Sequence, residues 1–183
     1  MPIKKNESTN QNSYQISKLD AARRQLETAI RLFFSEYDGV SIHTLASAAH
    51  EILTTIGREK NVSSLIRHRL KDHIKEELYP ELIGKMEEAA RFFRHGSNGA
   101  RKQLKFDPRQ TEIWIWDACL MYKQFCGEMT DYMMCFHVWY AIHNSDQISE
   151  PLLTRIKTIN FPTNLPKKEF IESFFRVHLL KLS

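Results

Sequence analysis

The segment from residue 91 to residue 109 contains the side chains of this chain whose types and spacing are best suited to chemistry. It reads R-F-F-R-H-G-S-N-G-A-R-K-Q-L-K-F-D-P-R and carries six Arg or Lys against one acid. Arginine binds phosphate oxygens through paired hydrogen bonds, and histidine can transfer a proton near neutral pH. Its two glycines let the backbone approach a ligand closely. We predict an anion-binding site with His95 as candidate catalytic residue and with these phosphate-binding or ligand-binding residues: Arg91, Arg94, Asn98, Arg101 and Lys102. The alternative is a solvated helix end whose cations balance the helix dipole.

A second group of candidate residues lies earlier in the chain, at His43, His50 and Glu51. The two histidines are seven residues apart, so they share one face of a helix about 10 Å apart along its axis. That separation is too large for both to bind one metal ion directly, and we therefore predict neither a metal site nor another cofactor. The sequence also has none of the phosphate-binding loops, nucleophile elbows or zinc-binding H-E-x-x-H patterns that mark common enzyme classes. This group remains a secondary candidate for a small-molecule site.

The elements that must position these residues are helices. The chain has only six Gly and six Pro in 183 residues, and its apolar residues recur at helical spacing. We predict an all-α fold, a compact bundle of about six to eight helices, with no strand. The expected helices cover these residues: 18–37, 42–56, 64–79, 81–95, 109–125, 131–143, 150–159 and 167–182. In the second of them, Ser41 would be the N-cap and Gly57 the end.

The expected helices over 109–125 and 131–143 are unusually rich in large apolar side chains. The first includes Trp114, Trp116 and Tyr122, and the second includes Phe136 and Trp139. Apolar side chains on nearly every side of a helix indicate burial on two fronts. One front would be the core of the chain and the other an interface between two copies, so these helices favour a homodimer.

The remaining sequence features limit the classes of protein to which this chain can belong. Residues 1–15 are polar and predict a disordered tail, which leaves 16–183 as a single helical domain. There is no secretory signal and no apolar run long enough to span a membrane. The three cysteines form no C-x-x-C pair, and we read Cys119 and Cys126 as small buried residues. The net charge is only +4. Together these features predict a cytoplasmic protein without a membrane span.

The basic helix end, A-A-R-F-F-R-H-G, resembles the HEPN superfamily, whose members are small helical domains, commonly dimeric. Many HEPN ribonucleases carry Arg, then a polar residue that is often Asn, then three residues, then His. With His95 on the family histidine, Arg91 takes the Asn position and Ala90 the position of the catalytic Arg. The stretches ARRQLETAIRLFF and SIHTLASAAHEIL also resemble small bacterial helical proteins that share an F-F-[KR]-H element. The resemblance implies a divergent member that binds RNA or a nucleotide phosphate near His95 and has lost the arginine that cleavage requires.

Three hypotheses therefore stand at the level of sequence. The first is a HEPN-like homodimer that binds RNA or a nucleotide phosphate near His95. The second is a non-catalytic helical module that dimerises through its aromatic helices. The third is a small-molecule or metal-binding helical protein that uses His43, His50 and Glu51.

Overall fold

The computed structural model is entirely helical in the part of the chain that it describes. That part comprises residues 13–60, 62, 64, 84, 87–95, 102–145 and 164–179. Within it the helices are α1 (Lys18–Phe34), α2 (Gly39–Lys60), α5 (Glu88–Arg94), α6 (Gln110–Cys126), α7 (Asp131–His143) and α9 (Lys167–Leu179), and there is no strand. The predicted all-α class is confirmed. Three predicted segments fall wholly or mostly outside the described residues: the helix over 150–159, the helix over 64–79 and the tail over 1–15.

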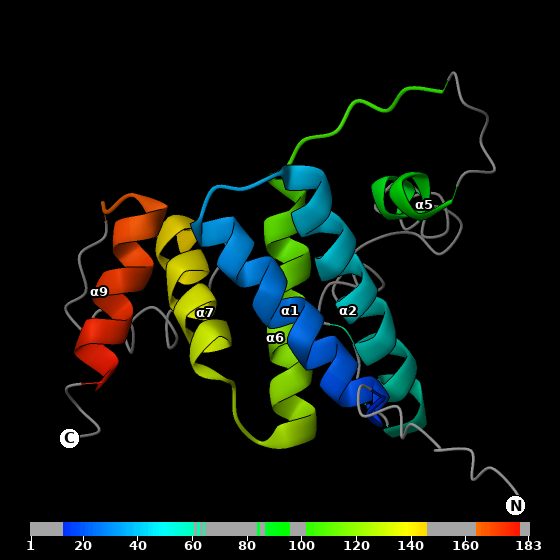
Figure 1. Ribbon diagram of the computed structural model, residues 1–183, viewed down its shortest axis with the longest axis horizontal. Coiled ribbons are helices and arrows are strands. Elements are labelled where there is room, and N and C mark those ends of the chain that lie inside the picture. Colours follow the sequence, from blue (N-terminus) through cyan, green and yellow to red (C-terminus); the bar gives the residue numbers. More distant parts are fainter. Residues whose placement is uncertain are drawn as a thin grey trace, which may run out of the picture.

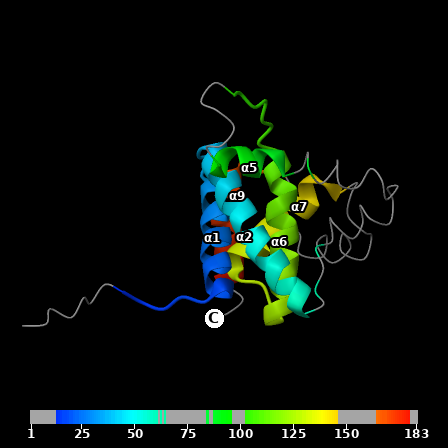
Figure 2. The same ribbon diagram turned by 90° about the vertical axis from the view of Figure 1, so that its right-hand side faces the viewer.

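Five of the helices surround one core (Figure 1). α1 crosses in front of α6, with α2 on one side of it and α7 on the other, while α9 packs on α1 and α7. The short helix α5 packs on α2 and runs across it instead of alongside it (Figure 2). This arrangement leaves α2 between the core and α5, so one face of α2 is buried and the opposite face can line a site.

An aromatic cluster joins α1, α7 and α9 at the centre of the core. Phe33 and Phe34, at the end of α1, meet Phe136 and Trp139 of α7 edge to face, with ring centroids 4.8–6.3 Å apart. Phe170 of α9 stacks on Phe34 at 5.9 Å. All five are at most 5% exposed. Edge-to-face contacts suit the charge distribution of aromatic rings, so this cluster fixes how the three helices meet.

Local capping sets the ends of α1 and the start of α2. Ser17 accepts a hydrogen bond from the backbone N–H of Asp20, as the sequence predicts for an N-cap. α1 ends at Phe34, three residues before the predicted end, and Glu36 just beyond it adopts a left-handed φ of 52°. Asp38 accepts from the N–H of Ser41 at 2.8 Å, so Asp38 caps α2 and the prediction of Ser41 as cap was wrong.

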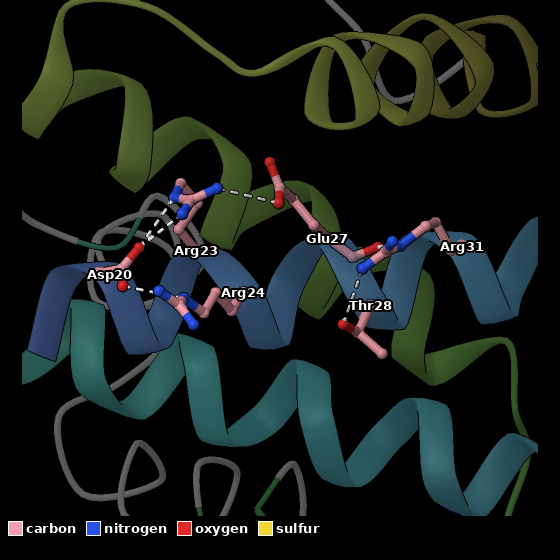
Figure 3. Close-up of polar contacts among 6 residues, drawn as sticks. All are labelled: Asp20, Arg23, Arg24, Glu27, Thr28 and Arg31. Carbon is pink, nitrogen blue, oxygen red and sulfur yellow. Dashed lines mark hydrogen bonds and ion pairs between the residues drawn. The ribbon is translucent and has the colours of Figure 1, made fainter. Parts of the chain in front are cut away.

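Partly buried ion pairs lie along α1 (Figure 3). Arg23 lies 2.6 Å from Asp20 and 3.2 Å from Glu27, and Arg24 lies 2.9 Å from Asp20. Hydrogen bonds from Arg23 and then Arg24 lower the pKa of the Asp20 carboxyl group. Because pairs three or four residues apart stabilise a helix, these charges are used within α1.

The aromatic side chains of α6 and α7 are buried inside a single chain. Trp114, Trp116, Tyr122, Phe136 and Trp139 are all 9% exposed or less. They pack around the core and the neighbouring helices and do not form an apolar surface. The large apolar residues that are exposed in the described part of the chain lie elsewhere: Tyr14, Ile16, Tyr37, Val40 and Val177. The core front predicted for these two helices is therefore observed, and the homodimer stays a prediction.

The three cysteines are free thiols in different surroundings. Cys119 and Cys135 are buried, and burial raises the pKa of both thiols. Cys126 is exposed at the end of α6, so its predicted burial was wrong.

Among the described residues, no helix is both long enough and apolar enough to cross a membrane.

Gly57 lies within α2, although the sequence analysis expected it to end this helix. The helix continues to Lys60, and the N–H of Val62 then returns to the carbonyl oxygen of Gly57 at 3.0 Å. A Cβ atom on Gly57 would lie 2.3 Å from the backbone oxygen of Val62. The glycine is required by this close backbone approach, and not by a helix end.

Replacing Gly57 with alanine should destabilise the fold, against the trend of helix propensity. Alanine favours a helix over glycine by about 1 kcal/mol. The clash with Val62 outweighs this, and we expect a net loss of about 1–3 kcal/mol in the free energy of unfolding, typical of overpacking. Urea unfolding of Gly57→Ala measures it. Gly84→Ala is the matched control, since among the described residues its Cβ would meet only a side-chain atom of Arg91, at 3.8 Å. A Gly57→Ala protein as stable as the wild type would contradict this account.

Candidate functional site

A cavity of about 450 Å³ lies between α2 and α5. The sequence analysis placed His50 and Glu51 in one group and Arg91, Arg94 and His95 in another, and the structure brings both groups to this cavity. Its lining residues come from α2, from α5 and its flanks, and from α6: Ser47, His50, Glu51, Thr54, Thr55, Arg58, Glu87, Ala90, Arg91, Arg94, His95 and Trp114. We refer to it as the α2–α5 pocket.

Apolar contacts hold α5 in place against the bundle. Ala89 and Ala90 are 5% and 2% exposed, which lets the helix approach closely. Phe93 packs edge to face against Phe106, with centroids 5.1 Å apart, and against the ring of His43 at 5.8 Å. This side of α5 is buried, so its charged residues are left to face the α2–α5 pocket.

The three charged or titratable residues at the end of α5 have different partners. Arg94 forms an ion pair with Glu51 of α2, and its Nε also donates to the carbonyl oxygen of Ala90 at 3.1 Å. Arg91 lies 3.7 Å from Glu87 and is half exposed. His95 follows the last helical residue in an extended conformation, and its side chain is exposed. Arg94 thus links α5 to α2 through its ion pair with Glu51, whereas Arg91 and His95 line the cavity.

Arg58 is a pocket residue that the sequence analysis missed. It was overlooked because α2 was expected to end at Gly57, one residue earlier. Thr54, Arg58 and Glu51 lie three or four residues apart, so one face of the longer helix brings all three to the pocket. Arg58 forms no ion pair with any described residue. A search for polar residues at helical spacing beyond Gly57 would have found it.

A buried polar chain lies at the floor of the pocket. The ring of His50 is 2% exposed, and its Nε2 lies 2.8 Å from a carboxylate oxygen of Asp117, which is fully buried. The same oxygen accepts a hydrogen bond from Ser64. On the other side of the ring, Nδ1 lies 3.4 Å from the hydroxyl of Thr54, and Trp114 covers the ring at 4.4 Å between centroids. His50 therefore links the hydroxyl of Thr54, which lines the pocket, to the buried carboxylate of Asp117.

Asp117 is the second residue that the sequence analysis missed. It stands in the run I-W-I-W-D-A-C-L-M-Y, as the one acid among large apolar residues. A charged residue is almost never fully buried without a partner. Its position therefore indicated a buried partner, although the sequence could not say which residue that was.

His43 lies outside the lining of the pocket. Its Nδ1 lies 2.9 Å from the hydroxyl of Thr111, and its Nε2 is buried with no hydrogen-bond partner. Burial, and to a lesser degree the charge of Arg94, lowers the pKa of His43 to about 4. The structure does not bring His43 to the pocket with His50 and Glu51, because His43 lies two turns, about 10 Å, before His50 along α2 and packs against Phe93 and Phe106 instead.

The other predicted binding residues are Asn98, Arg101 and Lys102. Asn98 and Arg101 lie outside the described residues. Lys102 is described and exposed, but it is not part of the lining. Within the described part of the chain, no three His, Cys, Asp or Glu side chains come close enough together to hold a metal ion.

The charge of the pocket lining is mixed, with an excess of cations. Arg58, Arg91 and Arg94 stand against Glu51 and Glu87. Both acids have an arginine partner within 4 Å, so Arg58 and His95, together with the half-exposed Arg91, are the groups placed to meet an incoming anion. Comparison with protein-family models, curated proteins and solved structures finds no match for this chain.

Proposed function

We propose that this chain is a HEPN-like helical protein, acting as a homodimer, that binds RNA or a nucleotide phosphate in the α2–α5 pocket next to His95. The observation that carries the proposal is the convergence of Arg58, Arg91 and His95 on one cavity. Arg58 and Arg91 lie on two helices, 33 residues apart in the sequence, and His95 follows the end of the second helix. Guanidinium groups bind phosphate oxygens strongly, and a cavity of this volume suits a single nucleotide.

The position of the arginines bears on the resemblance to HEPN ribonucleases. The family arginine falls on Ala90, and the neighbouring Arg91 is displaced by about 100° around a helix. Ala90, Arg91 and Arg94 all border the pocket. The displacement therefore leaves an arginine at the cavity, which supports binding of a phosphate group there.

Removing a pocket arginine should weaken binding of RNA or of adenosine monophosphate. A hydrogen bond to a charged group contributes about 1.5–3 kcal/mol, so Arg58→Gln or Arg91→Gln should raise the Kd at least about tenfold. Fluorescence anisotropy of a labelled single-stranded RNA measures this, with the nucleotide as competitor. Binding should also weaken as salt is raised, because phosphate contacts release counterions.

Arg109→Gln is the matched control. Arg109 belongs to the same basic segment, but it is 84% exposed, pairs with Asp107 and does not line the pocket. Its replacement removes the same charge and should change the Kd less than about twofold, as expected for an exposed ion pair. Equal weakening by Arg109→Gln would show that net charge, and not the pocket, binds the RNA. Wild-type protein that binds neither ligand would refute the proposal.

A further inference from the structure

Arg94 is the arginine of the α2–α5 pocket that is paired most closely with a carboxylate. Its Nη1 donates a hydrogen bond to Glu51 of α2, and its Nε donates to the carbonyl oxygen of Ala90 at 3.1 Å. Its side chain is 28% exposed, against 50% for Arg91, which lies 3.7 Å from Glu87. An anion in the cavity therefore reaches Arg94 only if it replaces Glu51.

Glu51 is placed so that it can be replaced. Its side chain is 60% exposed and lies at the junction where α5 runs across α2 (Figure 2). An exposed ion pair contributes little to stability, because water solvates both charges well when they separate. The carboxylate of Glu51 can therefore turn to solvent at small cost. A ligand takes its place on Arg94 when that ligand offers more negative charge than a single carboxylate.

The two common classes of biological phosphate differ in this respect. An internal phosphodiester carries one negative charge and has two oxygens free to accept hydrogen bonds. A terminal phosphate monoester carries a charge of about −1.5 to −2 at pH 7 and has three strong acceptor oxygens. Arg58, Arg91 and Arg94 line one cavity, so three guanidinium groups are available to three oxygens. The monoester can bind all three, whereas the diester has too few oxygens and too little charge to take Arg94 from Glu51.

We propose that the α2–α5 pocket recognises a terminal phosphate monoester, and that Arg94 selects it over a phosphodiester by exchanging Glu51 for a phosphate oxygen. This inference rests on the proposed function and narrows its ligand. The monoester belongs either to a free mononucleotide or to the phosphorylated end of an RNA. Arg94 is thus a specificity-determining residue, and Glu51 is its partner in the absence of ligand.

The charges around the cavity agree with a doubly charged ligand. Once Glu51 has turned to solvent, the lining holds Arg58, Arg91 and Arg94 against Glu87. That surplus of two positive charges equals the charge of a fully ionised phosphate monoester. His95 borders the same cavity and offers a further hydrogen-bond donor.

Two adenine nucleotides separate the phosphate classes. Adenosine 5′-monophosphate (AMP) is a monoester, and 3′,5′-cyclic AMP is a diester with the same base and sugar. At pH 7.5, isothermal titration calorimetry should give AMP a Kd at least about tenfold below that of cyclic AMP, as expected for one added charged hydrogen bond. Equal binding of the two would overturn this inference and leave phosphate binding in the pocket intact. Absence of binding by AMP, cyclic AMP and RNA would instead refute the proposed function.

Arg94→Gln and Glu51→Gln form a matched pair of variants. Both remove the ion pair between α2 and α5, so a purely structural role of this pair predicts that both weaken AMP binding. The exchange predicts opposite changes. Arg94→Gln should raise the AMP Kd at least about tenfold and bring it within a few fold of that of cyclic AMP. Glu51→Gln should lower the AMP Kd several-fold, because no carboxylate then competes for Arg94. Circular dichroism and thermal unfolding check that both variants fold, and a Glu51→Gln protein that does not bind AMP more tightly would overturn the exchange.

One RNA sequence with different ends identifies the source of the monoester. The oligomer is prepared with a 5′-phosphate, with a 3′-phosphate, or with hydroxyl groups at both ends, and each form competes against fluorescently labelled AMP. Competition by a phosphorylated form at the concentrations at which AMP competes would identify RNA ends as ligands. Competition by AMP alone would identify a free nucleotide. Hydroxyl-ended RNA that competes as well as the phosphorylated forms would contradict selection of a terminal phosphate.

Discussion

Lowering the pH from 7.5 to 5 should reduce the free energy of unfolding by about 4 kcal/mol, because two buried histidines resist protonation in the folded chain. Burial lowers the pKa of His43 and of His137 to about 4, against 6.5 for the ordinary side chain. Each of these differences costs the folded state about 2 kcal/mol at pH 5. The two sites lie on different helices and should contribute independently.

The direction follows from which state binds more protons. Between pH 6.5 and 4 the unfolded chain protonates both histidines and the folded chain does not, so acid favours unfolding. The stability is fully present above pH 6.5 and is lost as the pH falls through this window. Glu112 acts in the opposite direction, because burial raises the pKa of its carboxyl group. The measured loss should therefore be somewhat smaller than the sum over the two histidines.

Two substitutions test the origin of this acid sensitivity. His43→Asn retains a polar group for the hydroxyl of Thr111, which lies 2.9 Å from Nδ1. His137→Phe retains a ring to stack on Trp116, which it meets at 6.2 Å with the ring planes parallel. Urea unfolding at pH 7.5 and 5 should show about half the wild-type loss in each single variant and little loss in the double variant. A double variant with the full wild-type pH dependence would contradict the assignment.

Asp117→Ala should reduce the free energy of unfolding by about 3–5 kcal/mol, since it removes the acceptor at the centre of a buried network. The Nε2 of His50 would lose its partner while it remains buried, and Ser64 would lose the hydrogen bond that it donates to Asp117. The lost carboxylate volume would add a cavity beside the ring of His50. Thermal and urea unfolding at pH 7.5 measure the effect.

Asp117→Asn and Glu128→Ala are the comparison variants. Asparagine keeps the shape of Asp117 and one carbonyl oxygen that can accept from His50, so we expect it to cost less than alanine. Glu128 is exposed after the end of α6, and its removal should change stability by less than about 0.5 kcal/mol. If Asp117→Ala were as stable as Glu128→Ala, the buried network would not contribute to the fold.

The helical fold was largely predictable because its signals are local. The apolar repeat placed α7 at residues 131–143, as observed, and placed α6 within one residue of its observed bounds. Errors arose where a distant contact overrode a local preference. Gly57 indicated a helix end, yet it serves a close approach of Val62, and α2 continues to Lys60.

The candidate site depended on contacts that no local pattern contains. The sequence by itself identified His50, Arg91, Arg94 and His95 as residues able to do chemistry, because side-chain type alone carries that information. It could not show that Glu51 meets Arg94, 43 residues away, or that His50 meets Asp117, 67 residues away. Those pairings follow from how α5 and α6 pack on α2, and they depend on the shapes of many buried side chains at once. The sequence thus determined the helices and the candidate groups, and tertiary packing decided which groups share the pocket.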